Sequence, residues 1–460
     1  MRKYTMKEIA GITGGEIYRG DAESTVDKAF ADSRQAVPGG LYFALPGENR
    51  DGHEFLKDVL AAGGTAFVIS DADALDEAAA GADISAVKVA DTTDAMRKLA
   101  AHYLLSLDAV RIGITGSTGK TSTKDMMYAV SSVKYKTGRN LGNLNTVQGL
   151  CMTILGFDED IKVAILEMGM DKLGEIHELA GFIRPKIALM TNIGISHIER
   201  LGSRDNIFRA KMEIVDYFGP DNTLIISKGP DYLRRENVRR GDYRILMTGE
   251  DEDCDYVVSN IRERGLSGIS FDITHKGKKQ NIDLPVMGRH NALNAALAIA
   301  AGGEIGIPMK DAARGLRKME LTGGRLTVRR GRNGITIIDD TYNASPDSVN
   351  SAMKTLMKQA SDSGRHIAVL GDMFELGENE AEEHRRVGEN ARELGIDAVI
   401  TIGSLAENIA EGAGDIAVHF GTKEEFAGCA DEYIKQGDMV LVKASHGMHL
   451  EEVVRALSEE

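Results

Sequence analysis

The sequence has few cysteines that could form disulfides and no long apolar segment that could anchor it in a membrane. It contains no tryptophan, and aromatic residues make up 5% of its 460 residues. Its three cysteines, Cys151, Cys254 and Cys429, lie far apart and form no C-x-x-C pair, which argues against a disulfide framework and favours a reducing compartment. The first residues lack the apolar segment of a signal peptide, and apolar runs such as Ala295–Ala301 are too short to span a bilayer. We therefore expect a cytoplasmic protein without membrane insertion.

Positive charge is also in deficit. Lysine and arginine number 55 against 70 aspartate and glutamate residues, which gives a formal net charge of −15. Nucleic-acid binding needs a basic face, so we expect no nucleic-acid partner. A polyanionic substrate would have to be held by a few local cations.

The length suggests about three domains at roughly 150 residues each. Apolar strand patterns alternate with helix patterns, which predicts an α/β fold. We expect a small N-terminal α/β domain over 1–106 and a central, mostly parallel sheet over 107–321, with hairpins between about 250 and 285. Short strand–helix connections over 322–460 predict a C-terminal Rossmann-like domain with helices on both faces of its sheet.

A glycine-rich segment follows the first predicted strand of the central domain and opens a predicted helix. Backbone N–H groups in such a loop, together with the helix N-terminus, bind phosphate. Lys120 would reach the β- and γ-phosphates, and the Thr121 hydroxyl would ligate Mg²⁺. The general spacing of such loops would place glycine at 114, where this chain has Ile114. The expected nucleotide-binding residues here are Thr115, Gly116, Ser117, Thr118, Gly119, Lys120, Thr121 and Ser122.

Three further polar residues follow this loop in the central domain. Glu167 ends the apolar run Val163–Leu166, and His197 follows a second predicted strand. Ligands bind at this edge of open α/β sheets, and a carboxylate is a hard ligand suited to Mg²⁺. Lys211 lies on a predicted helix. Each residue alone is more often a surface or capping residue, so the argument depends on their joint order behind the phosphate loop.

Taken together, these segments resemble the Mur ligase family, whose members attach amino acids to peptidoglycan precursors. The matching segments are Thr115–Thr121, Leu166–Gly169, Thr191–His197, Ala210–Lys211 and Gly288–Asn294. The resemblance implies ATP as cofactor with an adenylate pocket near Asn294, one Mg²⁺ at Thr121 and Glu167, and a second at His197 and a carbamylated Lys211. The carbamate is chemically sensible, because an ammonium with a pKa of about 10.4 cannot ligate a cation, whereas a carbamate offers anionic oxygen.

Two segments of the third domain narrow the resemblance. Ile337–Pro346 and Val369–Gly377 are similar to family members that add D-alanyl-D-alanine to UDP-N-acetylmuramoyl-tripeptide. The Asp-Asn-Pro-Arg motif of members that add a diamino acid is absent. This resemblance implies an acyl-phosphate intermediate, with Arg325 stabilising the developing charge and Asp340 holding the ribose. The implied acceptor region consists of Tyr342, Asn343, Asp372, Lys443 and Ser445.

The first domain resembles the family's UDP-binding segments at Ser33-Arg34 and around Gly47 and His53. An arginine beside a hydroxyl is a sensible diphosphate contact, although an ordinary surface turn explains Ser33-Arg34 equally well. The resemblance implies that the first domain binds the UDP substrate, while the third binds the acceptor and closes over ATP. We expect a monomer.

The chain departs from the family pattern at Thr146, Cys151, Met212 and His446. His446 stands where the family has arginine, which leaves the exact acceptor open, and the third residue of the tripeptide is not determined by the sequence. Two other functions remain open: a related ligase with a different acceptor, and a P-loop regulatory ATPase. The latter would hydrolyse ATP slowly and without any acceptor.

Overall fold

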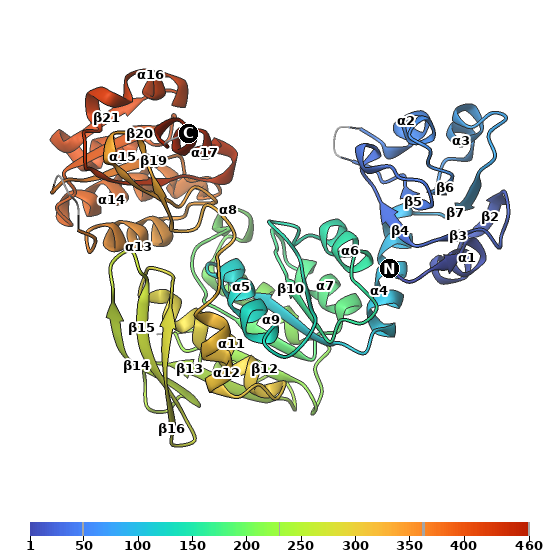
Figure 1. Ribbon diagram of the computed structural model, residues 1–460, viewed down its shortest axis with the longest axis horizontal. Helices are drawn as coiled ribbons and strands as arrows, with labels where there is room; N and C mark the ends of the chain where they lie inside the picture. Colours follow the sequence, from blue (N-terminus) through green and yellow to red (C-terminus); the bar gives the residue numbers. More distant parts are fainter. Residues whose placement is uncertain (48–49, 230, 361–363, 459–460) are drawn as a thin grey trace.

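The computed structural model describes residues 1–47, 50–229, 231–360 and 364–458. Three α/β units follow one another along the chain, with the first at one end of the molecule and the third at the other (Figure 1). Their main sheets run through residues 16–88, 110–284 and 327–443. The predicted α/β fold with three domains and parallel-rich sheets is confirmed.

The first unit has a five-stranded sheet in the order β2-β7-β6-β5-β4, in which β4 to β7 are parallel and β2 is an antiparallel edge. A small antiparallel pair, β1 and β3, lies beside it. The strands are β1 (Tyr4–Thr5), β2 (Glu16–Arg19), β3 (Thr25–Val26), β4 (Lys28–Phe30), β5 (Gly40–Phe43), β6 (Ala66–Ile69) and β7 (Ser85–Lys88). The helices are α1 (Met6–Thr13), α2 (Leu56–Ala61), α3 (Ala72–Ala78) and α4 (Thr92–Ser106).

The second unit has a nine-stranded sheet in the order β16-β15-β14-β13-β12-β11-β8-β10-β9. Neighbours from β9 to β14 are parallel, and the predicted hairpins extend the same sheet through the antiparallel strands β15 and β16. The strands are β8 (Val110–Thr115), β9 (Thr137–Arg139), β10 (Val163–Glu167), β11 (Ile187–Met190), β12 (Thr223–Ser227), β13 (Arg244–Gly249), β14 (Tyr256–Glu263), β15 (Ile269–His275) and β16 (Lys278–Leu284).

Helices cover both faces of this sheet, which explains why its central strands are continuous apolar runs rather than alternating ones. Residues of α5, α11 and α12 form a core with one face, while α6, α7 and α9 belong to the core on the other. The helices are α5 (Lys120–Ser131), α6 (Val147–Leu155), α7 (Glu175–Ile183), α8 (Ile198–Leu201), α9 (Arg204–Met212), α10 (Arg235–Val238), α11 (His290–Glu304) and α12 (Met309–Leu316).

The third unit has a six-stranded sheet in the order β17-β18-β22-β19-β20-β21, parallel except at the edge strand β17. Its strands are β17 (Thr327–Arg330), β18 (Thr336–Asp339), β19 (His366–Gly371), β20 (Ala398–Ile402), β21 (Ala417–Phe420) and β22 (Met439–Lys443). Its helices α13 (Pro346–Leu356), α14 (Glu380–Glu393) and α15 (Glu407–Ala413) cover one face, and α16 (Lys423–Tyr433) and α17 (Glu451–Leu457) cover the other. The Rossmann-like prediction is confirmed.

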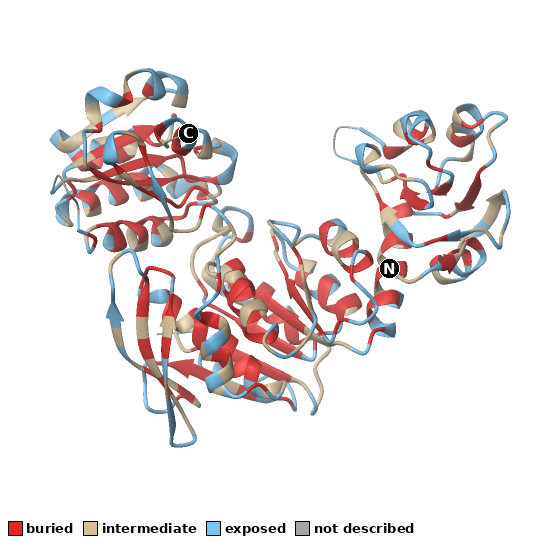
Figure 2. Cartoon of the chain, in the orientation of Figure 1, coloured by how far each residue is buried: buried red, intermediate tan, exposed pale blue. Residues whose placement is uncertain are grey.

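The first and second units share one hydrophobic core through α4. Leu99 and Tyr103 of α4 are fully buried, and the same cluster includes Leu150 of α6 and Leu179 of α7. The Tyr103 hydroxyl also donates a hydrogen bond to the carbonyl of Phe157, at 2.6 Å. Figure 2 shows the buried sides of α4, α6 and α7 together. Because this interface is a shared apolar core, it fixes the first unit against the second.

The second and third units meet through polar contacts and through Met287, which is buried in the core of the third unit. The backbone N–H of Thr322, in the connection between them, donates to Oδ2 of Asp125 at 2.8 Å. Asp125 lies on α5 and is buried, and its Oδ1 is 2.6 Å from Arg139. Farther along the interface, Lys358 after α13 pairs with Glu263 at the end of β14, at 2.8 Å. Among the described residues, no helix combines the length and apolar character that crossing a bilayer requires.

The shared core predicts a strong effect of truncation at Leu99. We expect Leu99→Ala to lower the free energy of unfolding by about 2–5 kcal/mol, because it removes buried methyl groups and leaves a cavity. Leu105→Ala on the same helix is the control: its side chain is 50% exposed, so its effect should stay within about 0.5 kcal/mol. Urea denaturation of the full chain measures both, and equal effects would contradict a core shared through α4.

Candidate active site

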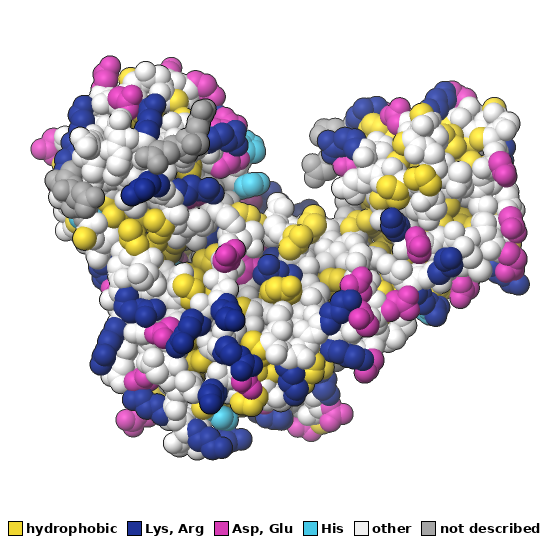
Figure 3. Space-filling view, viewed as in Figure 1, with side chains coloured by type: hydrophobic (Ala, Val, Ile, Leu, Met, Phe, Trp, Pro, Cys, Tyr) yellow, Lys and Arg dark blue, Asp and Glu magenta, His cyan; other side chains and the backbone are white. Residues whose placement is uncertain are grey.

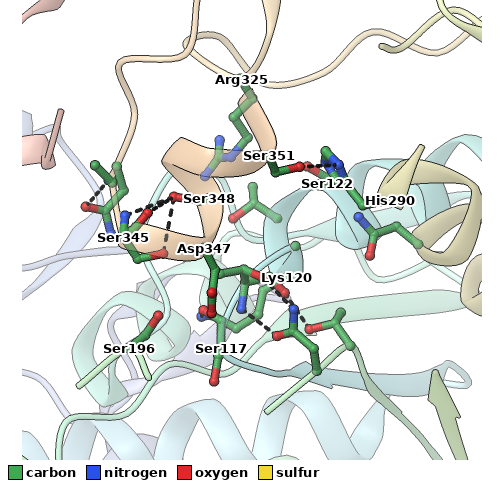
Figure 4. Close-up of a pocket in the computed structure, with 18 of the residues that line it drawn as sticks. Ser117, Lys120, Ser122, Ser196, His290, Arg325, Ser345, Asp347, Ser348 and Ser351 are labelled. Atoms are coloured by element: carbon green, nitrogen blue, oxygen red, sulfur yellow. Dashed lines mark hydrogen bonds between the residues drawn. The ribbon is translucent and has the colours of Figure 1, made fainter. Parts of the chain in front are cut away.

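A pocket of about 800 Å³ lies between the second and third units. It is lined by the glycine-rich loop, by the last residue of β10, by residues that follow β11 and β12, by the start of α11, and by loops and α13 of the third unit (Figure 4). Among the described residues, its lining includes none from the first unit. The second and third units therefore form this pocket, and the expected UDP-binding domain lies outside it.

Two glycines give the loop its shape. Gly116 has φ 146°, and a Cβ there would lie 1.8 Å from Oγ1 of Thr191. Gly119 has φ 78° and begins α5 as its N-cap, where a Cβ would lie 2.9 Å from Oδ1 of Asn294. Only glycine fits both the backbone conformation and the close approach at these positions. The helix N-terminus therefore opens directly into the pocket.

The segment after β11 holds this loop in place. The N–H of Thr118 donates to Oδ1 of Asn192 at 2.8 Å, and the N–H of Ser117 donates to the Asn192 carbonyl at 3.0 Å. The N–H of Gly194 donates to Oγ of Ser117 at 2.8 Å, and Oγ1 of Thr191 donates to the Thr118 carbonyl at 2.5 Å. Sequence reasoning gave Asn192 no role of its own. Its pairing with the loop depends on the approach of β11 to β8, which the local sequence does not show.

Two cationic side chains of the pocket are suited to phosphate. The Lys120 ammonium donates to the Gly116 carbonyl at 2.9 Å; burial lowers the pKa of Lys120, the charge of Glu167 raises it in part, and Arg325 lowers it. The guanidinium of Arg325 stacks on Tyr342, 3.4 Å from the ring centroid. Its Nη1 is buried and has no hydrogen-bond partner among the described residues. An unpaired buried donor beside a phosphate loop fits the phosphates of a nucleotide.

Glu167 lies at the buried end of β10, opposite the start of α5. Its Oε2 accepts a hydrogen bond from the Thr121 hydroxyl at 2.8 Å and lies 3.1 Å from the Lys124 ammonium. The side chains of Glu167 and Lys124 are both almost fully buried. The resemblance to the family implied that Thr121 and Glu167 act together, and the structure brings them into contact. Lys124 was missed, although it lies one helical turn after Lys120 and so on the same side of α5.

A second group of possible cation ligands lies at the edge of the pocket. Nδ1 of His197 is 2.7 Å from Oε2 of Glu375 and 3.2 Å from Oδ1 of Asp171. This nitrogen is buried, yet it makes no hydrogen bond of acceptable geometry within the described chain. Mg²⁺ and Mn²⁺ bind carboxylate oxygen, and Mn²⁺ also binds imidazole nitrogen. These three side chains therefore fit such an ion. Glu375 was also missed from the sequence.

Lys211 lies near the end of α9 and is 1% exposed. Burial lowers the pKa of its ammonium well below the usual range, and the charge of Lys120 lowers it further. The amine is therefore biased toward its neutral form, which is the form that reacts with carbon dioxide. This environment fits a carbamylated lysine, although Lys211 itself is not part of the pocket lining.

Most predicted residues of the third unit do line the pocket. Asp340 pairs with Lys443 at 2.7 Å and accepts a hydrogen bond from the N–H of Leu326 at 3.1 Å. Lys443 also donates to the Asn343 carbonyl at 2.7 Å. The other lining residues among those expected are Ser117, Thr118, Gly119, Lys120, Thr121, Ser122, Glu167, His197, Asn294, Arg325, Tyr342 and Ser445. Thr115, the last residue of β8, and Gly116 of the loop lie outside the lining.

Asp372 is a correction to the expected acceptor region. It is 5% exposed, lies outside the pocket lining, and its Oδ1 accepts hydrogen bonds from the N–H groups of Leu405 and Ala406, at 3.0 and 2.7 Å. Burial raises its pKa, which these hydrogen bonds partly offset. These hydrogen bonds tie the loop after β19 to the loop after β20, outside the pocket.

The expected UDP-binding residues lie on the first unit, away from the pocket. Arg34 is exposed and pairs with Asp32 at 2.7 Å, next to Ser33 in a short 3₁₀ helix. Nε2 of His53 accepts hydrogen bonds from the N–H groups of Ser70 and Asp71, while its Nδ1 lies 2.6 Å from Asp51. The Gly47 N–H donates to the Arg50 carbonyl at 3.0 Å. His53 thus joins two loops, and UDP binding stays a prediction.

The four departures from the family pattern have local explanations. The Thr146 hydroxyl caps the N-terminus of α6, and Cys151 and Met212 are fully buried in the core between the first two units. Only His446 lines the pocket, where its ring lies 5.6 Å from that of Tyr342. Three of the four therefore leave the pocket unchanged.

Comparison with known proteins gives consistent matches along the chain. Three family models match it: "Mur ligase family, catalytic domain" at residues 29–104, "Mur ligase middle domain" at 114–302, and "Mur ligase, glutamate ligase domain" at 324–446. The UDP-N-acetylmuramoyl-tripeptide--D-alanyl-D-alanine ligase of Bacillus subtilis is 38% identical, with 100% of this chain and 99% of that protein covered. The Escherichia coli ligase of the same name is 32% identical, with the same coverage.

Solved structures agree with these matches. MurF from Acinetobacter baumannii superposes with a TM-score of 0.90 at 28% identity, over 100% of both chains. MurF from Thermotoga maritima, solved in complex with ADP, gives a TM-score of 0.81 at 26% identity, over 94% of this chain and 97% of that one. With relatives this similar over its whole length and a phosphate-loop pocket between its second and third units, the chain belongs to the Mur ligase family.

Proposed function

We propose that this chain is an ATP-dependent ligase that joins D-alanyl-D-alanine to UDP-N-acetylmuramoyl-tripeptide in peptidoglycan precursor synthesis. The observation that carries the proposal is the pocket in which Lys120 of the second unit and Arg325 of the third lie together beside the phosphate loop. The full-length relatives with this printed activity support the choice of substrates.

ATP would bind with its phosphates on the first turn of α5 and its adenylate end near Asn294, and Asp340 would hold the ribose. Thr121 and Glu167 would hold one Mg²⁺, and His197 and carbamylated Lys211 a second. When bound, these ions would neutralise charge on the phosphates. The carbamate forms when the neutral Lys211 amine adds to carbon dioxide and loses a proton, which the surroundings of this lysine favour.

The reaction proceeds in two steps. A terminal carboxylate oxygen of the tripeptide attacks the γ-phosphorus, ADP leaves, and an acyl phosphate forms. The amine of D-alanyl-D-alanine then attacks the acyl carbon, loses a proton, and releases phosphate, which keeps the former carboxylate oxygen. Lys120 and Arg325 donate to the phosphoryl oxygens where negative charge develops. Closure of the third unit over the second would exclude water, which would otherwise hydrolyse the acyl phosphate.

The three units divide this work. Residues 1–106 would hold the UDP end of the substrate through Ser33, Arg34, Gly47 and His53, and 107–321 would bind ATP. Residues 322–460 would bind the acceptor around Tyr342, Asn343, Lys443 and Ser445, and close over ATP. The visible face is hollowed between the first and third units (Figure 3), which leaves room for a long substrate to reach the pocket. We propose that the chain acts as a monomer in the cytoplasm, where ATP and UDP-linked precursors occur.

Phosphate release tests this function most simply. We expect release from ATP only when UDP-N-acetylmuramoyl-tripeptide and D-alanyl-D-alanine are both present, with the amide product formed in equal amount. A regulatory ATPase would instead release phosphate slowly and independently of the acceptor. Parallel reactions with single amino acids in place of the dipeptide test whether the chain is a related ligase with another acceptor.

Lys120→Met should reduce turnover by at least roughly 100-fold, the loss typical of removing one charge-stabilising donor from an active site. Binding of the UDP substrate should change little, because its expected site lies on the first unit. Lys310→Met is a matched control, since Lys310 is exposed on α12 and outside the pocket. Steady-state rates and calorimetric titration with UDP substrate provide the two readouts. An equal loss of UDP-substrate affinity would contradict the division between units.

Lys211→Ala should lose most activity, because it removes the proposed carbamate oxygens. Short carboxylates such as formate or acetate should restore part of it by entering the space left by the side chain. In the wild-type protein, ¹³C-labelled bicarbonate should give a carbamate signal in the ¹³C spectrum that the variant lacks. Wild-type activity in Lys211→Ala would rule out the carbamate role.

A further inference from the structure

Glu375 of the third unit reaches across the boundary to the second. It lies in the loop between β19 and a short 3₁₀ helix at Gly377–Asn379, and its Oε2 is 2.7 Å from Nδ1 of His197. Asp171 approaches the same nitrogen at 3.2 Å. Each of the three residues offers one ligand atom, and these atoms lie within 4.8 Å of one another. Two units therefore supply a single cluster of possible metal ligands.

The loop that carries Glu375 is fixed by buried side chains. The N–H of Met373 donates to Nε2 of His384 at 2.9 Å, and the N–H of Phe374 donates to Oγ of Ser445 at 2.9 Å. His384 is fully buried, and Asp372, just before this segment, is anchored to the start of the neighbouring loop. The backbone is held immediately before Glu375, so the direction of its side chain is determined by the third unit.

Both sides of the boundary have unusual backbone conformations. Glu375 and His197 each have φ 66°, a left-handed conformation that residues other than glycine rarely adopt. Such conformations cluster at functional sites. Beyond them, a Cβ on Gly377 would lie 3.2 Å from Cα of Glu199 on α8. The Glu375 loop is therefore in close contact with the helix that His197 begins.

The donor atoms of this cluster fit a cation, while the positive charges of Arg200 and Lys120 offset the two carboxylates in part. Asp171 is balanced by Arg200, whose Nη1 lies 2.5 Å from Oδ2. The buried Nδ1 of His197 makes no acceptable hydrogen bond to the carboxylates beside it or to any other described residue. Two carboxylates directed at one imidazole nitrogen form a donor set of mixed oxygen and nitrogen, which suits Mg²⁺ and Mn²⁺.

We propose that Asp171, His197 and Glu375 hold one divalent cation across the boundary, so that the third unit completes the site by supplying Glu375. The inference deepens the proposed function, in which His197 is already a cation ligand. It adds Glu375 as a ligand from the third unit. As a consequence, the cation holds the third unit against the second. Other contacts at the same boundary, such as Ser351 to His290 at 3.0 Å, are compatible with this arrangement.

The direct test is Mn²⁺ binding without nucleotide, measured by electron paramagnetic resonance of the free ion. We expect Glu375→Gln to weaken binding by roughly tenfold or more, because ligand charge largely sets the affinity of such sites. Glu378→Gln is the matched control, since Glu378 is exposed three residues away and outside the pocket. Equal Mn²⁺ affinity in wild type and Glu375→Gln would overturn the proposal.

Small-angle scattering provides a readout other than binding. Mn²⁺ should make the wild-type protein more compact and leave Glu375→Gln unchanged, with similar melting temperatures for both. Asp171→Asn tests the site from the other unit and should weaken Mn²⁺ binding as well. Compaction that occurs equally in chelator and in Mn²⁺ would overturn the proposal. Cation binding that depends on Glu375 in a protein without ligase activity would refute the proposed function and leave this inference standing.

Discussion

The site depends first on the hydrogen bonds between the phosphate loop and the segment after β11. Asn192 binds the loop through its side chain and its carbonyl, and Thr191 and Gly194 add further bonds. These contacts fix where α5 begins, and therefore where Lys120 and Thr121 lie relative to Glu167 at the end of β10. A phosphate site built on two adjacent parallel strands is rigid before any ligand binds, which is what positioning of a phosphoryl group requires.

The two interfaces of the second unit differ in kind. The first unit is joined to it by a continuous apolar core around α4. The third is joined by polar contacts such as Thr322 with Asp125 and Ser351 with His290, and by the single buried apolar side chain of Met287 among the described residues of its core. A polar interface of this kind permits relative motion, while an apolar core resists it. The first unit is therefore fixed against the second, and the polar interface is compatible with the closure proposed for the third unit. Asp125 and Lys120 lie on the same helix, α5, so the connection to the third unit is anchored close to the phosphate site.

The sequence predicted those strands that a continuous run of apolar residues marks. Apolar runs predicted β8, β10 and β11, and the position of Glu167 at a strand end placed it at the ligand-binding edge of the sheet. The resemblance to the family implied its pairing with Thr121, which it contacts in the structure. The sequence did not predict β17, because this edge strand is largely exposed and has no apolar pattern. It also missed Lys124, Asn192 and Glu375. Their environments arise when distant segments approach one another, and a single sequence contains no local signal for such contacts.

Asp372 is the opposite case, a residue that the sequence placed in the site and that lies outside the pocket. It lies in a segment with a strong resemblance to the family and directly follows β19, where ligands of parallel sheets bind. The chain nevertheless turns its carboxylate toward Leu405 and Ala406, and Glu375, three residues later, faces the pocket instead. The course of the loop decides which of two nearby carboxylates lines the pocket, and that course depends on His384 and Ser445.

The central claim is that ATP activates a substrate carboxylate as an acyl phosphate in the pocket between the second and third units. Transfer of oxygen isotope tests it most directly. With ¹⁸O in the terminal carboxylate of UDP-N-acetylmuramoyl-tripeptide, each phosphate released in the presence of D-alanyl-D-alanine should carry one ¹⁸O atom, and the ADP none. Released phosphate without ¹⁸O from the substrate would show that water attacks ATP instead, and would contradict the account.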